Sequence, residues 1–318
     1  MLLKMKLTDI EKASQLISPF IQKTPLIHVP MLDAPGRKLF LKCEHQQVTG
    51  SFKVRGAFYT LLSLSEIDKK RGVVTRSAGN FAKALSLAGQ ILKIPVTVVM
   101  PLHVPEVKKE GVKKYGAKII LHGTKHAESQ AKVEDIAVKE GLVALSPYDH
   151  RDVIIGQGTL GLEIKEQLPS IGHYIAPIGG GGLMGGTAFA LKESDPSINV
   201  IGVEPDGAGD YYLSCQKGFK QTLSSTHSIA DGLLAPTVGT LNWPLLQRSV
   251  DHNMLVTDEE IIQAMKFLYT NLDFVVEPSG AASLAAFLYH PELALQGNVV
   301  AVLTGGNVDL DKFHSWVL

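Results

Sequence analysis

The sequence predicts an α/β fold with two open parallel-sheet domains, and two observations lead to this prediction. Short continuous apolar segments, such as residues 95–100 and 174–178, alternate along the chain with longer segments of helical periodicity, such as 127–140 and 153–168. Strands that are apolar throughout, rather than at every second residue, indicate parallel strands buried on both faces. Such strands alternating with helices are typical of an α/β architecture.

The first half of the chain begins with an expected helix. Thr8, with Glu11 three residues later, predicts a capping box, and the helix should end near Phe20, after Pro19. The elements expected next are, in order, a strand at 39–43, a helix from Phe52 onward, a strand at 72–75, a helix at 82–91, a strand at 95–100, a helical segment at 104–115, a strand at 119–121 and a helix at 127–140.

A second series of elements begins after Pro147. The elements expected there are a helix at 153–168, a strand at 174–178, a helix at 183–193, a strand at 200–204, a helix at 259–272 capped by Thr257 and Glu260, a helix at 281–289 and a strand at 299–304. Residues 205–253 lack clear periodicity. We expect a small domain of residues 66–147, inserted into a large domain of residues 1–65 and 148–318.

Composition limits the class of protein. With 318 residues, 45% of them hydrophobic, the chain has ample core for two domains. Lys plus Arg and Asp plus Glu each number 31, so no basic field favours nucleic acid or an anionic membrane, and a small-molecule ligand is expected. Cys43 and Cys215 form no CxxC motif, which predicts a reduced, cytoplasmic protein without disulfides or structural zinc. No signal peptide is recognised, and no apolar segment approaches the ~20 residues of a transmembrane helix.

Lys53 is the first candidate functional residue. It follows Gly50, Ser51 and Phe52 in the first turn of an expected helix, where the positive end of the helix dipole disfavours an ammonium. A lysine in this position is a candidate for a lowered pKa, which an amine needs to act as a nucleophile or to form a Schiff base. Taken alone, a lysine near Arg55 is also typical of a solvated charge. Other segments of the chain are needed to distinguish a reactive amine from a solvated one.

Four consecutive glycines, Gly179, Gly180, Gly181 and Gly182, lie between an expected strand and an expected helix. Backbone N–H groups and the helix dipole then point to one place, which predicts a phosphate site. The glycines also match a dinucleotide fingerprint, Gly180-x-Gly182-x-x-Gly185 with Glu204 after the next strand, and close helix packing is a third reading. Together with Lys53 and the polar turn at 77–80, the phosphate site favours pyridoxal phosphate over a dinucleotide.

Several motifs recur in a known family in this order and spacing. They are Ser51-Phe52-Lys53-x-Arg55-Gly56-Ala57, Ser77-Ala78-Gly79-Asn80, Gly156-Gln157-Gly158-Thr159, the four glycines, Asp231-Gly232, Glu277-Pro278 and Gly305-Gly306-Asn307. Over nearly its whole length the chain resembles pyridoxal-phosphate enzymes of the tryptophan synthase β-like fold (fold type II), in the threonine/serine dehydratase and serine racemase branch. The resemblance implies a cofactor in the cleft between two domains and, as is usual in the family, a homodimer.

The resemblance also implies roles for individual residues. Lys53 would form the Schiff base with the cofactor and later remove the substrate Cα proton, and Phe52 would pack against the cofactor ring. The glycines 179–182 would hold the phosphate. Asn80 would bind the 3-hydroxyl oxygen of the cofactor, and the turn of Ser77, Ala78, Gly79 and Asn80 would bind the substrate carboxylate.

Two further assignments follow from the resemblance. Thr304 matches the Ser or Cys opposite the pyridine nitrogen, where a neutral hydroxyl makes the cofactor a weaker electron sink and favours loss of a β-leaving group. Glu204, the carbonyl of Ala208 and Asp210 match the family's divalent-cation site, and these oxygen ligands suit Mg²⁺ or another hard divalent cation. The alternative for these two acids is a solvated loop.

Three positions depart from the family pattern. Ala78 stands where serine racemases carry a Ser that acts on the far face of the cofactor, which favours elimination over racemisation. Phe81 replaces the usual His and Lys83 a common Gln, and both leave the substrate open. The chain ends soon after Asn307, so a C-terminal regulatory domain and feedback inhibition by isoleucine are not expected.

The predicted function is an ammonia-lyase (dehydratase) for L-threonine, L-serine or a related 3-hydroxy amino acid. On the same scaffold, a serine or amino-acid racemase and a 3-hydroxyaspartate dehydratase are the alternatives. Two more distant alternatives are a pyridoxal-phosphate-binding protein without catalysis and a Rossmann dehydrogenase.

Overall fold

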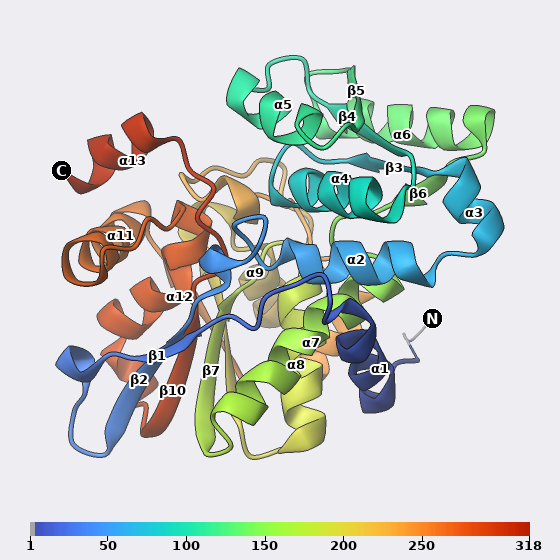
Figure 1. Ribbon diagram of the computed structural model, residues 1–318. Helices are drawn as coiled ribbons and strands as arrows, with labels where there is room; N and C mark the ends of the chain where they lie inside the picture. Colours follow the sequence, from blue (N-terminus) through green and yellow to red (C-terminus); the bar gives the residue numbers. More distant parts are fainter. Residues whose placement is uncertain (1–3) are drawn as a thin grey trace.

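The computed structural model describes residues 4–318, apart from the side chain of His126, and contains two sheets. The strand order is β1-β2-β10-β7-β8-β9 in the six-stranded sheet and β5-β4-β3-β6 in the four-stranded sheet. Each sheet is the centre of one lobe, and helices α1 (Leu7–Ile17) and α13 (Leu310–Val317) lie on opposite sides of the molecule (Figure 1). None of the helices in the described part combines the length and apolar character that a membrane span needs.

The six-stranded sheet is parallel except at one edge. Its strands are β1 (Leu26–His28), β2 (Arg37–Lys42), β7 (Ile171–Pro177), β8 (Asn199–Pro205), β9 (His252–Val256) and β10 (Gly297–Val302). Strand β1 pairs antiparallel with β2, and every other pairing in this sheet is parallel. The predicted α/β class with parallel sheets is therefore confirmed, with one short antiparallel strand added at the edge.

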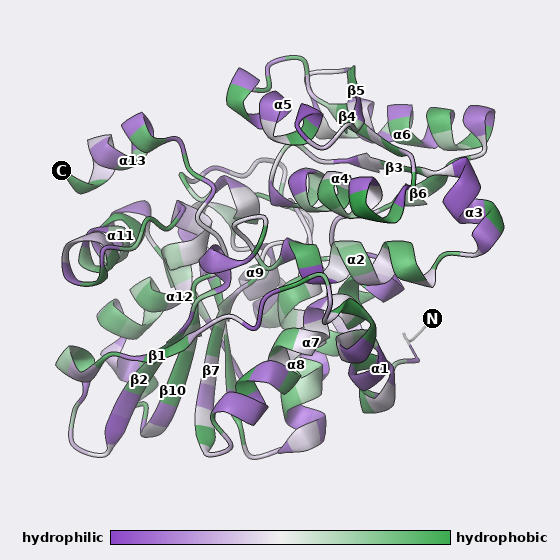
Figure 2. Ribbon diagram, in the orientation of Figure 1, coloured by the Kyte–Doolittle hydropathy of each residue, from purple (hydrophilic) through white to green (hydrophobic). Residues whose placement is uncertain are grey.

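Helices cover both faces of this sheet because alternate side chains of its strands point in opposite directions. Val299 and Ala301 belong to a core that includes residues of α11, α12 and α13, whereas Val300 and Val302 pack with residues of α7 and α8. The helices of this lobe are α1 (Leu7–Ile17), α7 (Arg151–Gln167), α8 (Gly182–Ser194), α9 (Asp210–Lys217), α10 (Asn242–Ser249), α11 (Asp258–Leu272), α12 (Pro278–Tyr289) and α13 (Leu310–Val317). Strand β10 and helix α12 are largely hydrophobic along their length (Figure 2).

The four-stranded sheet follows the same rule on a smaller scale. Its strands are β3 (Val73–Arg76), β4 (Val96–Met100), β5 (Lys118–Leu121) and β6 (Val143–Leu145), all parallel. Val73 and Val98 share a core with residues of α4 (Asn80–Leu92) and α5 (Glu106–Lys113). Val74 and Val99 pack on the opposite face against α6 (His126–Glu140). The short helix α3 (Glu66–Arg71) precedes β3.

Helix α2 (Lys53–Ser63) lies between the two lobes and contacts both α7 and α4 (Figure 1). Its contact with α7 depends on two glycines. A Cβ atom on Gly56 would lie 2.5 Å from Nε2 of Gln157, and one on Gly156 would lie 2.6 Å from the Cα of Gly56. The absence of side chains at both positions therefore lets the two helix backbones approach closely, and this fixes the helix that begins with Lys53.

Some local predictions are wrong. Helix α1 begins at Leu7, and the carboxylate of Asp9 accepts a hydrogen bond from the Lys6 N–H, so the predicted capping box of Thr8 and Glu11 is not formed. Strand β10 ends at Val302, two residues before Thr304. The capping box of Thr257 and Glu260 is confirmed.

The division into domains at residues 66 and 147 stays a prediction, although all four strands of the smaller sheet lie within 73–145. Within residues 4–318, seven α-helices and strands have no counterpart in the predicted series: β1, α3, β6, α9, α10, β9 and α13.

Candidate active site

Lys53 is the first residue of α2, and its half-buried side chain turns toward the start of α7. Its Nζ donates to the carbonyl of Pro147 over 3.1 Å and lies 5.0 Å from the ring centre of Phe52 and 6.0 Å from that of Phe81. Burial lowers the pKa of Lys53 to about 8, although the charge of Glu277 opposes the shift. The position of Lys53 at a helix start predicted a lowered pKa because of the helix dipole, whereas in the structure burial is the main cause of the shift.

The glycine loop connects β7 to α8. Within residues 4–318 no group accepts a hydrogen bond from the backbone N–H of Gly179, Gly180 or Gly181. A Cβ atom on Gly180 would lie 2.2 Å from the ring of Tyr148, and Gly181 has φ +89°, which favours glycine. The loop thus presents free N–H groups at the N-terminus of α8, where the helix dipole also favours an anion.

Lys53 and the glycine loop are connected through two adjacent residues. Pro147 accepts the hydrogen bond from Lys53, and the ring of Tyr148, the next residue, lies against Gly180. The amide of Asn242 holds the same segment by donating to the carbonyls of Tyr148 and Gly180, each over 2.9 Å. The structure therefore brings together the lysine and the loop that the sequence singled out.

The turn at 77–80 joins β3 to α4 in the smaller lobe. The hydroxyl of Ser77 accepts hydrogen bonds from the N–H groups of Gly79 and Ala82, over 3.4 and 3.3 Å, so it satisfies one N–H of the first turn of α4, whose N-cap residue is Gly79. Ala78 is half-buried, Gly79 is exposed, and Asn80 is the first residue of α4. Asn80 reaches the other lobe, since its Nδ2 donates to Oε1 of Glu277 over 2.6 Å.

Thr304 lies next to Phe52, the residue that precedes α2. Its carbonyl accepts a hydrogen bond from the N–H of Phe52 over 3.1 Å, and its buried hydroxyl donates to the carbonyl of Ser279 over 3.3 Å. Phe52 itself is almost fully buried. Thr304 and Phe52 therefore lie next to Lys53, and their contacts with a cofactor stay a prediction.

The predicted cation ligands Glu204 and Asp210 are buried and close to each other. Glu204 accepts from the N–H groups of Tyr211 and Tyr212 and from the side chain of Asn253, over 2.9, 2.7 and 2.8 Å. Burial raises the pKa of Glu204 to about 8 and that of Asp210 to about 7.

Ala208, the third predicted ligand, lies between these acids in a short 3₁₀ turn, Asp206–Ala208. Within residues 4–318 no three His, Cys, Asp or Glu side chains gather as metal ligands, so this set has only two carboxylates and a backbone carbonyl.

Glu277 is a further candidate site residue. The sequence analysis named it only as part of the motif Glu277-Pro278. It is buried, and it contacts Asn80. Burial, helped by the charge of Asp231, raises the pKa of Glu277 to about 8, whereas the hydrogen bond from Asn80 and the charges of Lys108 and Lys83 lower it. An acid immediately before a Pro-initiated apolar helix was the signal that could have identified it.

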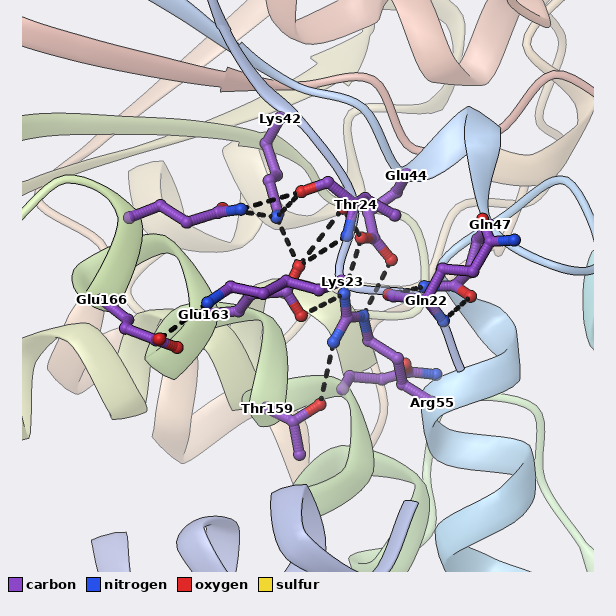
Figure 3. A network of polar contacts seen from close by, with 12 residues as sticks. Gln22, Lys23, Thr24, Lys42, Glu44, Gln47, Arg55, Thr159, Glu163 and Glu166 are labelled. Atoms are coloured by element: carbon purple, nitrogen blue, oxygen red, sulfur yellow. Dashed lines mark hydrogen bonds and ion pairs between the residues drawn. The ribbon is translucent and has the colours of Figure 1, made fainter. Parts of the chain in front are cut away.

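A buried network of ion pairs and hydrogen bonds holds Arg55, near the start of α2, in place (Figure 3). Arg55 donates from Nε and Nη2 to the two carboxylate oxygens of Glu44, both over 2.8 Å, and from Nη2 to Glu163 over 2.9 Å. Lys42 donates to Glu163 over 2.5 Å, and Thr24 donates to Glu44. The two positive and two negative charges balance, and the network fixes the residue two positions after Lys53.

Comparison with known proteins adds the family. A model of the family described as "Pyridoxal-phosphate dependent enzyme" matches residues 17–305. Serine racemase from Arabidopsis thaliana is 41% identical over 317 residues, which cover 96% of each protein. The catabolic L-threonine dehydratase of Staphylococcus aureus (strain USA300) is 39% identical over 311 residues, covering 96% of this chain and 90% of the dehydratase.

Solved structures that superpose on this chain include a serine racemase and a threonine deaminase. Maize serine racemase superposes with a TM-score of 0.93 at 38% identity, over 98% of this chain and 96% of its own. Threonine deaminase isoform 2 from Solanum lycopersicum superposes with a TM-score of 0.92 at 35% identity, over 98% and 86%. Because the family model covers most of the chain and these relatives and structures match it over nearly its whole length, the chain belongs to the family of pyridoxal-phosphate dependent enzymes, in the branch of the serine racemases and threonine dehydratases.

Proposed function

We propose that this protein is an ammonia-lyase for L-threonine, L-serine or a related 3-hydroxy amino acid, which it converts to a 2-oxo acid and ammonia. The observation that carries the proposal is the position of the Lys53 amine, whose pKa burial lowers to about 8. The amine donates to the carbonyl of Pro147, and the next residue, Tyr148, packs its ring on Gly180 of the glycine loop. A reactive amine next to a phosphate site is the arrangement that pyridoxal phosphate requires.

The residues present fit this cofactor. The free N–H groups of Gly179, Gly180 and Gly181 would hold its phosphate, and glycine at 180 is required because a side chain there would overlap Tyr148. Phe52 would pack against the cofactor ring. When bound, pyridoxal phosphate withdraws electrons from the substrate Cα, so that a proton and the β-hydroxyl can leave.

The other residues would bind the substrate and move its proton. Lys53 is well placed to remove the Cα proton, because an amine with a pKa of about 8 is partly neutral at physiological pH. The turn of Ser77, Ala78, Gly79 and Asn80 would bind the substrate carboxylate at the N-terminus of α4. Loss of water from the substrate and later hydrolysis then give the oxo acid and ammonia.

Racemisation is the alternative function, since serine racemases are as similar to this chain as threonine dehydratases are. Ala78 favours elimination, because it offers no hydroxyl to deliver a proton to the second face of the substrate. Thr304 points the same way: it is neutral, and its hydroxyl proton is donated to Ser279. A 3-hydroxyaspartate dehydratase remains a second alternative on the same scaffold.

We also propose a divalent cation, Mg²⁺ or a similar ion, at Glu204, the carbonyl of Ala208 and Asp210. Support comes from the burial of both carboxylates, because two neighbouring buried acids need protons or a cation to balance their charge. A homodimer is proposed from the family resemblance, and light scattering of the purified protein will test it.

The function is tested by following 2-oxo acid release from L-threonine and L-serine after addition of pyridoxal phosphate. We expect oxo acid from at least one substrate and none from the Lys53→Ala variant. Chiral chromatography of the same reactions measures D-serine, which should be a minor product and should increase in Ala78→Ser. D-serine as the main product would replace the lyase with the racemase. A visible absorption band from lysine-bound cofactor without either product would reject both.

A further inference from the structure

Asn307 is the centre of a hydrogen-bonded bridge between the two lobes. Its Oδ1 accepts from Nζ of Lys83 over 2.6 Å, and its Nδ2 donates to Oδ1 of Asn80 over 2.7 Å and to the carbonyl of Thr49 over 2.8 Å. Asn80 continues the bridge to Glu277. Lys83 and Asn80 belong to α4 of the smaller lobe, whereas the other members belong to the larger one.

The chemistry at the two ends fixes the direction of every hydrogen bond in this bridge. The ammonium of Lys83 has only donors, so the oxygen of Asn307 must face it. The amide nitrogen of Asn307 must then face the oxygen of Asn80, which turns the nitrogen of Asn80 toward Glu277. Glu277 fits this direction at the other end of the bridge, because its Oε1 can accept the hydrogen bond from Asn80 whether the carboxyl group is ionised or carries its proton on the other oxygen. One N–H of Asn80 is used by Glu277, and the second is left for a ligand.

Two glycines make room for this bridge. A Cβ atom on Gly50 would lie 2.7 Å from Oδ1 of Asn307, and one on Gly305 would lie 2.2 Å from Oε1 of Glu277. Either side chain would displace an atom that takes part in the bridge. The glycines on both sides of the site are therefore matched to the positions of Asn307 and Glu277.

We propose that Lys83 is a positioning residue, which acts through Asn307 to orient the amide of Asn80 so that one N–H faces the cofactor site. This rests on the role proposed above for Asn80, which would donate to the cofactor. Among the described residues Lys83 forms no ion pair, and its ammonium donates to the amide oxygen of Asn307. A neutral apolar side chain at position 83 would remove the donor to Oδ1 of Asn307, so that only Thr49 and Asn80 would hold the Asn307 amide.

Lys83→Met, Lys83→Arg and the control Lys12→Met test this proposal. Lys12 is exposed on α1, so its variant removes one charge without touching the bridge. The first measurement is hydrogen–deuterium exchange of residues 77–83 in the protein without cofactor. We expect faster exchange in Lys83→Met, because the link from α4 to Asn307 is lost, and wild-type exchange in Lys83→Arg and Lys12→Met.

The second measurement is the dissociation constant of pyridoxal phosphate, by titration of the visible absorption band. Loss of a hydrogen bond that involves a charged group weakens binding by about tenfold or more, and we expect this for Lys83→Met alone. If Lys83→Met behaves like Lys12→Met in both measurements, or if Lys83→Arg is as impaired as Lys83→Met, the positioning role is wrong. Neither measurement uses an amino acid, so failure of the lyase assignment would leave them interpretable.

Discussion

Replacing Arg55 by Met would test whether the buried network holds the start of α2. Arg55 is 1% exposed and Glu44 is fully buried. Without the guanidinium, Glu44 keeps only the hydrogen bond from Thr24, whereas Glu163 keeps Lys42. The variant therefore leaves one buried carboxylate without its main partner.

The expected loss of stability follows from that buried charge. Breaking a buried ion pair by removing one partner costs about 3–5 kcal/mol. For a chain of this size, each kcal/mol lowers the melting temperature by about 2 °C, so Arg55→Met should melt roughly 6–10 °C below the wild type. Lys23→Met removes an ion pair with Glu166 that is exposed on both sides, and it should change the melting temperature by no more than about 1–2 °C.

The pH dependence separates the charge effect from a loss of packing. Burial alone would raise the pKa of Glu44, but the charge and hydrogen bonds of Arg55, with Lys42, lower it. In the wild type the stabilisation is present above the unfolded-state pKa of about 4.3 and is lost as the pH falls through the lower folded-state pKa. In Arg55→Met burial dominates, so Glu44 takes up a proton as the pH falls from neutral and the cost is relieved.

Differential scanning calorimetry at pH 8 and pH 5, without added cofactor, measures both effects. The difference between wild type and Arg55→Met should be larger at pH 8 than at pH 5. An equal difference at both values would refute the argument from charge. A loss no larger than that of Lys23→Met would refute the role of the network altogether.

Three other predictions concern the cofactor and the cation. Attachment of pyridoxal phosphate to Lys53 requires the neutral amine, so its rate, followed by visible absorbance, should rise with pH through about 8 rather than through 10.5. Gly180→Ala should weaken cofactor binding and cost about 1–3 kcal/mol of stability by overpacking, whereas Gly111→Ala, whose Cβ contacts nothing in α5, should be neutral or slightly stabilising in thermal melts. Mg²⁺ should raise the melting temperature more at pH 8 than at pH 6, because protons on Glu204 compete with the cation below its pKa of about 8, and Glu204→Gln should abolish the increase. An increase that is the same at both pH values would argue against Glu204 as a ligand.

The parts of the fold that could be predicted from sequence are those with a long, strong pattern. Strands β4 and β7 and helices α6 and α7 appear within a few residues of their expected positions, because each has a continuous apolar segment or several turns of periodicity. Residues 205–253 contain α9 and α10, of eight residues each, which are too short to show a period. Strand β1 has three residues and is defined by its pairing with β2 rather than by its own sequence.

Residues of the candidate site also differ in how far the sequence could predict their role. Lys53 and the glycine loop could be identified because the local sequence determines their chemistry, through a helix start and bare N–H groups. Arg55 could not be interpreted, since a charge next to Lys53 is usually solvated. Its partners lie 11 and 108 residues away along the chain, and only the packing of α2 on α7 brings them to it. Burial of an ion pair is thus a property of distant contacts that local sequence does not contain.

The arrangement of the site also explains why contacts between the lobes matter for its function. Lys53, the glycine loop and Thr304 are fixed to the larger sheet, whereas the turn at 77–80 belongs to the smaller one. The exposed pair of Lys108 and Asp231 also links the lobes, but exposed ion pairs contribute little. The partly buried bridge from Lys83 through Asn307 and Asn80 to Glu277 is the stronger connection. It ends on the residues that would face cofactor and substrate, so any change that weakens it alters the geometry of the site before it alters the fold.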